Sequence, residues 1–282
     1  MRFPDGELPD GVDASRECAA WFLDGRQPVA HSIRIRQRLF RRSSPRWAVP
    51  PLANLLSGAR GSADTRTTMV LWLMFAQSFR PAPDGLSTSA ANWARLLGLP
   101  LRTRRAGSLR RVGTARSALQ QQSWIRPGRG GLIQLLDPTT GRAYTPETAN
   151  ETSVRMRHRR EYIERKSATQ ARYHPEHWEL DPLTMPAELW ANGWVAGLSA
   201  KGLIAYMVLL NHRDTDGISR VPKVRTHQYA ITSDLWAPAV EELTRCRLVR
   251  SHNLGSVGAV PSLGYELLDE GLQRNAPPRL FL

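Results

Sequence analysis

One arrangement of predicted elements occurs twice in this sequence of 282 residues, and it limits the possible folds more than any other feature. An apolar helix, a turn, a short helix, a third helix and two short strands around a Gly-rich turn follow one another between residues 65 and 136. The same order returns between residues 198 and 269. Helical spacing of apolar residues, ended by Pro or Gly, predicts the helices, and the Gly-rich turns predict the hairpins. We therefore expect a mainly α fold with small β-hairpins, built from two similar parts.

The third helices of the two parts superpose when the sequence is shifted by 124 residues. Ser108 then falls on Thr232, and both are predicted to be N-cap residues. Apolar residues recur at helical spacing on the inner face of each helix. They are Leu109, Val112, Ala115 and Leu119 in the first helix and Leu235, Ala239, Val240 and Leu243 in the second. The shift therefore indicates a structural repeat.

The order of three helices and a hairpin resembles a winged helix, in which the third helix enters the major groove of DNA and the hairpin lies against the backbone. Small α+β domains can share this element order, but here it occurs twice. The segment 229–249 resembles the recognition-helix region of bacterial winged-helix regulators, with a Thr cap, the run Ala-Val-Glu-Glu-Leu and a final Leu-Val. By architecture alone, two winged helices joined by a helix also resemble iteron-type plasmid replication initiators. The resemblance implies two winged-helix (helix-turn-helix) domains joined by a helical linker, and binding to DNA.

The charge is distributed unevenly along the chain. The formal net charge is +14, and its excess lies between residues 31 and 172, since residues 173–282 hold more acids than bases. Nucleic acid is the polyanion that such a basic region is expected to bind. We predict four segments: an N-terminal extension with a basic arm (1–62), a first winged helix (63–140), a charged helical linker (141–175) and a second winged helix (176–282).

The predicted DNA contacts come from the basic arm and the first winged helix. With its apolar face turned inward, the third helix presents Arg110, Arg111, Thr114 and Ser117, which can bond base edges or phosphates. Gly113 lies in the middle of this helix, is unfavourable there and has no explanation in the sequence. Arginine runs can also be an ordinary solvated surface, but these cluster where a winged helix contacts DNA. The full predicted set is Arg34, Arg36, Arg38, Arg41, Arg42, Arg102, Arg104, Arg105, Arg110, Arg111, Thr114, Ser117, Arg126 and Arg129.

The second winged helix departs from this pattern at its third helix. Its outward face is predicted to offer Asp234, Trp236, Pro238 and Glu241, and phosphates repel an acidic face. We therefore predict that this domain mainly packs against a partner through Asp234, Trp236 and Glu241. The partner is another copy of the chain or a different protein. A position in the core is the alternative for Trp236.

Signatures of catalysis and of metal binding are missing from the sequence. His174 and His177 have no third ligand nearby, and Cys246 with His252 does not match a metal site. Since no phosphate-binding loop or nucleophile motif occurs either, we expect no enzyme activity, no cofactor and no metal. Two cysteines, no export signal and no apolar run near about 20 residues predict a cytoplasmic, nucleoid-associated protein without a membrane segment.

These features favour a bacterial sequence-specific protein that binds double-stranded DNA, either a plasmid or phage replication initiator or a transcriptional regulator. The alternative is a winged-helix protein-interaction subunit of a nucleoprotein complex with nonspecific affinity for DNA. The nearly neutral second half fits this alternative, whereas the strongly basic segment 31–145 favours DNA reading. RNA is a weaker choice, because no aromatic-bearing sheet motif is visible.

Overall fold

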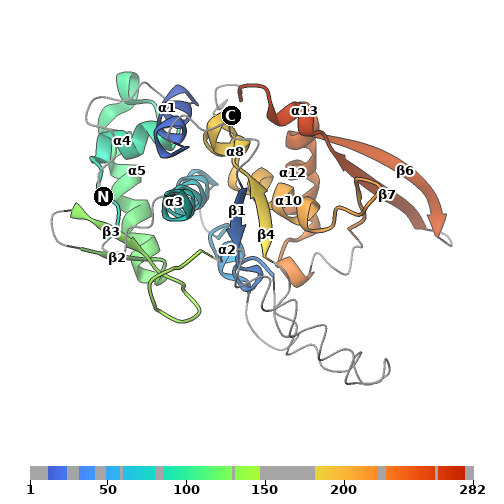
Figure 1. The fold of residues 1–282 in the computed structure, drawn as a ribbon, viewed down its shortest axis with the longest axis horizontal. Helices are drawn as coiled ribbons and strands as arrows, with labels where there is room; N and C mark the ends of the chain where they lie inside the picture. The colour runs from blue at the N-terminus through green and yellow to red at the C-terminus, as the bar shows by residue number, and fades with distance from the viewer. Residues whose placement is uncertain are drawn as a thin grey trace.

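Figure 1 shows the computed structural model, which is mainly helical with small antiparallel sheets. It describes residues 12–23, 32–41, 49–57, 60–79, 85–128, 131–146, 182–221, 227–257 and 260–276. The elements of the first half are α1 (Val12–Leu23), β1 (Ser32–Ile35), η2 (Gln37–Leu39), α2 (Pro51–Asn54), α3 (Arg60–Phe79), α4 (Ala90–Leu96), α5 (Leu101–Gln121), β2 (Ile125–Pro127) and β3 (Ile133–Leu135). Those of the second half are β4 (Leu183–Pro186), α8 (Glu188–Ala191), α9 (Trp194–Gly197), α10 (Ala200–Asn211), β5 (Ile218–Ser219), η5 (His227–Tyr229), α12 (Ser233–Arg245), β6 (Val249–Val257), β7 (Val260–Leu267) and α13 (Asp269–Leu272). The predicted linker lies outside the described residues from residue 147 to its end.

The order of elements repeats in the two halves. In the first unit (residues 60–136), α3 is followed by a one-residue bridge at Leu86, α4, α5 and the hairpin β2–β3. In the second unit (residues 200–268), α10 is followed by β5, η5, α12 and the hairpin β6–β7. Leu86 pairs with β3, and β5 pairs with β7. The short strand therefore joins the second strand of the hairpin in both units.

Both third helices end in the same backbone turn. The chain leaves α5 through Ser123 at φ 59° and α12 through Arg247 at φ 55°, two positive values that are rare outside glycine. These two residues are 124 positions apart, which is the shift that the sequence predicts. The next residue then donates its N–H to a carbonyl five residues earlier, Trp124 to Leu119 at 2.8 Å and Leu248 to Leu243 at 2.9 Å. The repeat therefore extends from the sequence to the backbone geometry.

A two-stranded sheet connects the two halves. Strand β1 pairs antiparallel with β4, Ile33 opposite Met185 and Ile35 opposite Leu183, and both isoleucines are fully buried. Figure 1 shows this pair between the two units, whose hairpins extend to opposite sides. Residues 32–41 are therefore not the free basic arm that the arginine count predicts. Alternating Ile and Arg place the apolar side chains in the core, as in a half-buried strand.

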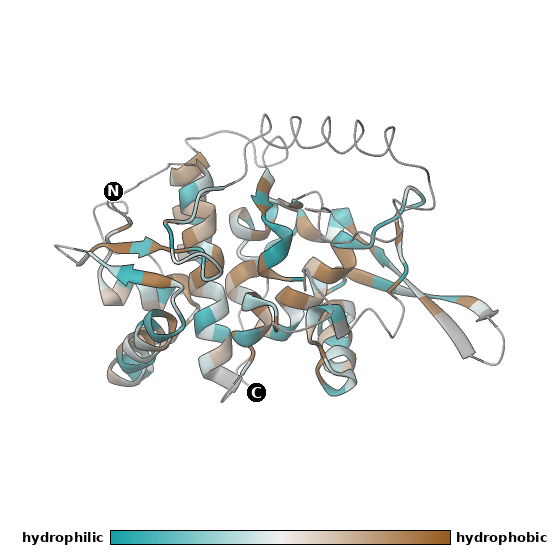
Figure 2. Ribbon diagram, turned by 90° about the horizontal axis from the view of Figure 1, so that it is seen from below, coloured by the Kyte–Doolittle hydropathy of each residue, from teal (hydrophilic) through white to brown (hydrophobic). Residues whose placement is uncertain are grey.

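The buried apolar residues of both units form one continuous core. Its centre lies at α3, where Phe75 stacks on Trp190 of α8 with 5.1 Å between ring centroids. Helix α1 closes the core, because Phe22 packs edge-on against Phe75 at 5.7 Å. Figure 2 shows the apolar ribbon concentrated in the helices at the middle of the molecule. Helix α1 is therefore part of this core.

Helix α5 begins earlier than predicted. It starts at Leu101 and has a kink at Arg104, where φ is −140° and ψ is 43°. Ser108, the predicted cap, lies inside the helix and donates its hydroxyl to the Pro100 carbonyl at 2.7 Å. The kink brings Ser108 within reach of a carbonyl eight residues earlier, so a hydroxyl that the sequence indicates as an N-cap lies inside the helix. The predicted inner face is confirmed, since Val112, Ala115 and Leu119 are buried and Leu109 is half-buried.

Candidate nucleic-acid interface

The exposed face of α5 carries three of the side chains predicted to contact DNA. Arg110, Thr114 and Ser117 are exposed on the side opposite the buried Val112 and Ala115. Within the described part of the chain, no carboxylate pairs with Arg110. The guanidinium charge of Arg110 is therefore not compensated by a neighbouring acid.

Gly113 lies on this same face. A Cβ atom at this position would have no heavy atom within 4 Å, so packing does not require a glycine. Alanine in its place would favour the helix by up to about 1 kcal/mol. The fold therefore gives no reason for Gly113, but a glycine lets another molecule come close to the helix backbone.

The matching face of α12 has the opposite character. At the shift of 124 residues, exposed acids and a proline replace the basic and hydroxyl residues of α5: Asp234 matches Arg110, Pro238 matches Thr114, and Glu241 matches Ser117. Trp236 matches the buried Val112 instead, is half-buried, and packs edge-on against Tyr265 at 6.1 Å between centroids. The predicted outward position of Trp236 is therefore corrected to one against the core.

The hairpins differ in the same way as the helices. In β2, the exposed Arg126 lies opposite Gln134, which is neutral. In β6, the matching Arg250 lies opposite Glu266 and forms an ion pair with it at 3.2 Å. His252 lies 2.9 Å from the same carboxylate. A carboxylate therefore compensates the arginine of the second hairpin and not that of the first.

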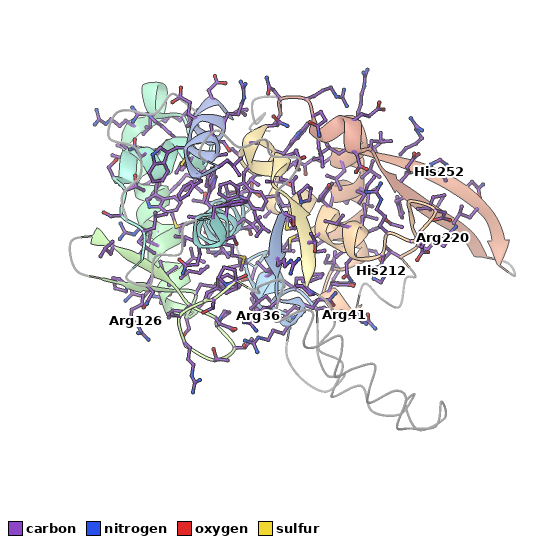
Figure 3. The ribbon with its side chains drawn as sticks, in the orientation of Figure 1. Arg36, Arg41, Arg126, His212, Arg220 and His252 are labelled. Atoms are coloured by element: carbon purple, nitrogen blue, oxygen red, sulfur yellow. The ribbon has the colours of Figure 1, made fainter. Side chains whose placement is uncertain are left out.

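The loop after β3 brings together arginines from two parts of the chain. Arg36 Nε donates to the Thr145 carbonyl at 3.3 Å, and Arg126 Nη2 donates to the Gly141 carbonyl at 3.5 Å. Figure 3 shows Arg36, Arg41 and Arg126 along one edge of the molecule, the lower edge in that view. Backbone carbonyls orient the guanidinium groups of Arg36 and Arg126, and no acid in the described part of the chain pairs with either of them.

Arg38 is paired within the protein. Its guanidinium forms an ion pair with Asp137, whose side chain is only 5% exposed. Thr139 donates its N–H to the same carboxylate at 2.9 Å. Burial alone would raise the pKa of Asp137, but the hydrogen bonds from Thr139 and Arg38 outweigh it and hold this pKa below its usual value. The folded state therefore favours the ionised carboxylate.

Asp137→Asn should lower the free energy of unfolding at pH 7 by about 2 kcal/mol, because asparagine keeps one acceptor oxygen but loses the charge to which Thr139 and Arg38 donate. Since the pKa of Asp137 is lowered by folding, its stabilisation is present above the unfolded pKa of about 4 and disappears as the pH falls further. The difference between wild type and variant should therefore shrink below pH ~4. Urea unfolding from pH 7 to 3 measures it, with the exposed Asp13→Asn as control. A difference that stays constant over this range would contradict the assignment.

The other predicted contacts fall in three places. Arg34 is half-buried in β1, opposite Thr184. Arg104 and Arg105 are exposed at the start of α5, and Arg111 and Arg41 are half-buried. Outside the described residues and side chains lie Arg42, Arg102 and Arg129.

Comparison with protein-family models, with curated proteins and with solved structures finds no match for this chain. No described helix is long and apolar enough to cross a membrane. Within the same residues, His, Cys, Asp and Glu form no group of three or more that could hold a metal ion. The residues of the two third helices and the two hairpins therefore carry the functional conclusion.

Proposed function

We propose that this chain is a sequence-specific protein that binds double-stranded DNA through two winged helices. It reads DNA mainly with the first unit and associates with a partner through the second. The contrast between matched positions of α5 and α12 carries this proposal, since Arg110 and Ser117 on one helix correspond to Asp234 and Glu241 on the other. The two helices end in the same backbone turn, so they differ in the side chains of their exposed faces and not in this part of the backbone.

The connectivity of each unit supports the winged-helix assignment. A short strand joins the second hairpin strand, and the third helix precedes the hairpin in both units. In winged-helix proteins the third helix lies in the major groove and the hairpin against the backbone. Arg110 then faces base edges, and Arg126 of β2 faces phosphates.

The second unit offers a surface suited to a protein partner. Asp234 and Glu241 are exposed on α12, and the apolar Leu263 is 50% exposed on β7. Leu263 lies two residues before Tyr265, so the two side chains are on the same face of the hairpin. Trp236 packs against Tyr265 on this face. A second copy of the chain is one partner of this kind, and a different protein is the other.

The rival function is a protein-interaction subunit that holds DNA without reading its sequence. The ion pair between Arg250 and Glu266 favours this rival for the second unit. Selection from a random pool of DNA duplexes at two salt concentrations separates the two functions, because salt dependence reports phosphate contacts and an enriched motif reports base contacts. We expect an enriched motif, whereas binding that disappears with modest salt and enriches nothing would establish the rival.

The arrangement of selected sites also separates the two processes that the proposal covers. Repeated sites in an origin next to the gene would indicate a replication initiator. A single palindrome overlapping the gene's own promoter would indicate a transcriptional regulator. An initiator acts by binding and bending DNA and by recruiting other proteins, and so needs no catalytic motif of its own.

Gly113→Ala should raise stability and weaken DNA binding. Alanine stabilises the helix by up to about 1 kcal/mol, while its methyl group separates the α5 backbone from the DNA. Ala237, the matching residue of α12, gives the control: Ala237→Gly should lower stability by a similar amount and leave DNA affinity unchanged. Thermal unfolding and fluorescence anisotropy on the selected duplex measure the two quantities. A more stable Gly113→Ala protein with unchanged affinity would remove Gly113 from the contact.

A further inference from the structure

The exposed arginines in and beside the second unit fall into two sets. Three have acidic partners: Arg213 pairs with Asp269 at 2.9 Å, Arg220 with Asp214 at 2.9 Å, and Arg250 with Glu266 at 3.2 Å. Arg245, Arg247 and Arg274 are exposed as well, and none of them pairs with an acid in the described part of the chain. The uncompensated charge therefore lies at the C-terminal end of α12 and just after α13.

Two of these unpaired arginines line a surface groove of about 710 Å³. Arg247 and Arg274 face it together with Arg250, and Ser251 adds a hydroxyl group, whereas the Thr244 hydroxyl donates to the Val240 carbonyl at 2.9 Å. Glu270 is the acid among its lining residues. A groove with several guanidinium groups, one hydroxyl donor and one carboxylate favours an anion with several acceptor oxygens.

Close backbone packing holds this groove in shape. The left-handed turn at Arg247 directs its carbonyl toward α13, and Arg274 Nη2 donates to this oxygen at 3.1 Å. A Cβ at Gly271 would lie 2.4 Å from the same oxygen, so α13 can pack here only with a glycine. The fold thus places Arg247 and Arg274 on one groove, and no acid in the described part of the chain pairs with either of them.

We propose that this groove binds phosphate groups, those of a nucleic-acid backbone. The proposal deepens the proposed function and rests on it, since it gives the second unit a DNA contact away from its acidic α12 face. Figure 1 places α13 at the opposite side of the molecule from β2 and β3. The groove therefore contacts a stretch of backbone different from the one that lies on the first hairpin. A free polyphosphate carries the same chemistry and is the other possible source of the anion.

The double variant Arg247→Asn, Arg274→Gln tests the groove. Asparagine tolerates the left-handed backbone of position 247, and glutamine keeps a donor for its carbonyl. The matched control is Arg213→Ala, Arg220→Ala, which removes two arginines that already have acidic partners. Binding to a long duplex that contains the selected motif is measured over a range of salt concentrations, and inorganic pyrophosphate is titrated separately with thermal unfolding as the readout.

We expect the groove variant to reduce the slope of log K against log salt by about 2, since each phosphate contact contributes about 0.9. The control should keep the wild-type slope. Stabilisation of wild type by pyrophosphate, lost in the groove variant while the slope is unchanged, would identify a free polyphosphate as the ligand and overturn the nucleic-acid assignment. A wild-type slope with no effect of pyrophosphate would overturn the groove altogether. In both of these outcomes the protein still binds the selected motif through α5. Failure of the proposed function would appear instead as the absence of an enriched motif with the wild-type protein.

Discussion

Arg110→Asp should weaken binding to the selected duplex by about 100-fold and leave the melting temperature unchanged. A bidentate contact from arginine to a guanine edge contributes about 1–3 kcal/mol, and an aspartate adds repulsion from the phosphates. Arg110 is exposed, and no described carboxylate pairs with it, so its loss leaves no unpaired acid in the fold. The substitution also installs the residue that α12 carries at the matched position, Asp234. Anisotropy titrations on the selected duplex measure the affinity.

The reciprocal variant Asp234→Arg is the control for Arg110→Asp. Both change one exposed residue at matched positions of α5 and α12, and both change the net charge by two. If the first unit reads the site, only Arg110→Asp abolishes the enriched motif, while Asp234→Arg leaves it intact. Loss of affinity from Asp234→Arg as large as that from Arg110→Asp would contradict the division of roles between the two units.

The periodic parts of the fold could be predicted from the sequence, because helical spacing fixes which residues of a helix share a face. Val112, Ala115 and Leu119 are buried as predicted, and their counterparts Ala239 and Leu243 are buried in α12. The burial of these residues follows from their spacing along the helix, and contacts with distant segments do not change it.

The sequence also contains a second, shorter repeat at a different shift. Asp-Gly-Leu-Ser at residues 84–87 and Asp-Gly-Ile-Ser at residues 216–219 are 132 positions apart. In the structure Gly85 and Gly217 have φ values of 100° and 81°, and each leads into the short strand that joins its hairpin. A Cβ at Gly85 would lie 2.5 Å from the Ile133 carbonyl, so this turn requires a glycine. The third helices match at a shift of 124 residues, whereas the second strands of the two hairpins match at a shift of 132, since Gln134 corresponds to Glu266.

Contacts between distant segments could not be predicted. Strand β1 pairs with β4 about 150 residues later, and nothing near Ile33 and Ile35 indicates that partner. The sequence predicts that Arg38 is free to bind an anion. In the structure it pairs with Asp137, which lies just after strand β3 of the first hairpin. Local charge therefore overestimates how many arginines have no acidic partner, because some partners, such as Asp137, lie far away in the chain.

Two adjacent glutamates of α12, Glu241 and Glu242, are expected to contribute very differently to the free energy of unfolding. Glu241 is exposed, whereas the carboxylate of Glu242 accepts the Ser199 N–H at 2.7 Å and the Ser199 hydroxyl at the start of α10. The Glu242 carboxylate fills the space beside Gly202 of α10, since a Cβ at Gly202 would lie 2.7 Å from Glu242 Oε2. Asp64 of α3 accepts the neighbouring Ala200 N–H at 2.7 Å. Two carboxylates from different helices therefore hold the N-terminus of α10, where the helix dipole favours negative charge.

Glu242→Ala should lower the free energy of unfolding by about 3 kcal/mol, because it leaves a half-buried N–H and a hydroxyl without their charged acceptor. Glu241→Ala should change it by less than about 0.5 kcal/mol, as for an exposed side chain. Both variants alter helix propensity equally, so the difference between them isolates the contact between α12 and α10. Glu242→Gln should fall between the two, since it keeps an acceptor but loses the charge. Urea unfolding measures all three, and equal losses for Glu241→Ala and Glu242→Ala would contradict the role of Glu242 in joining α12 to α10.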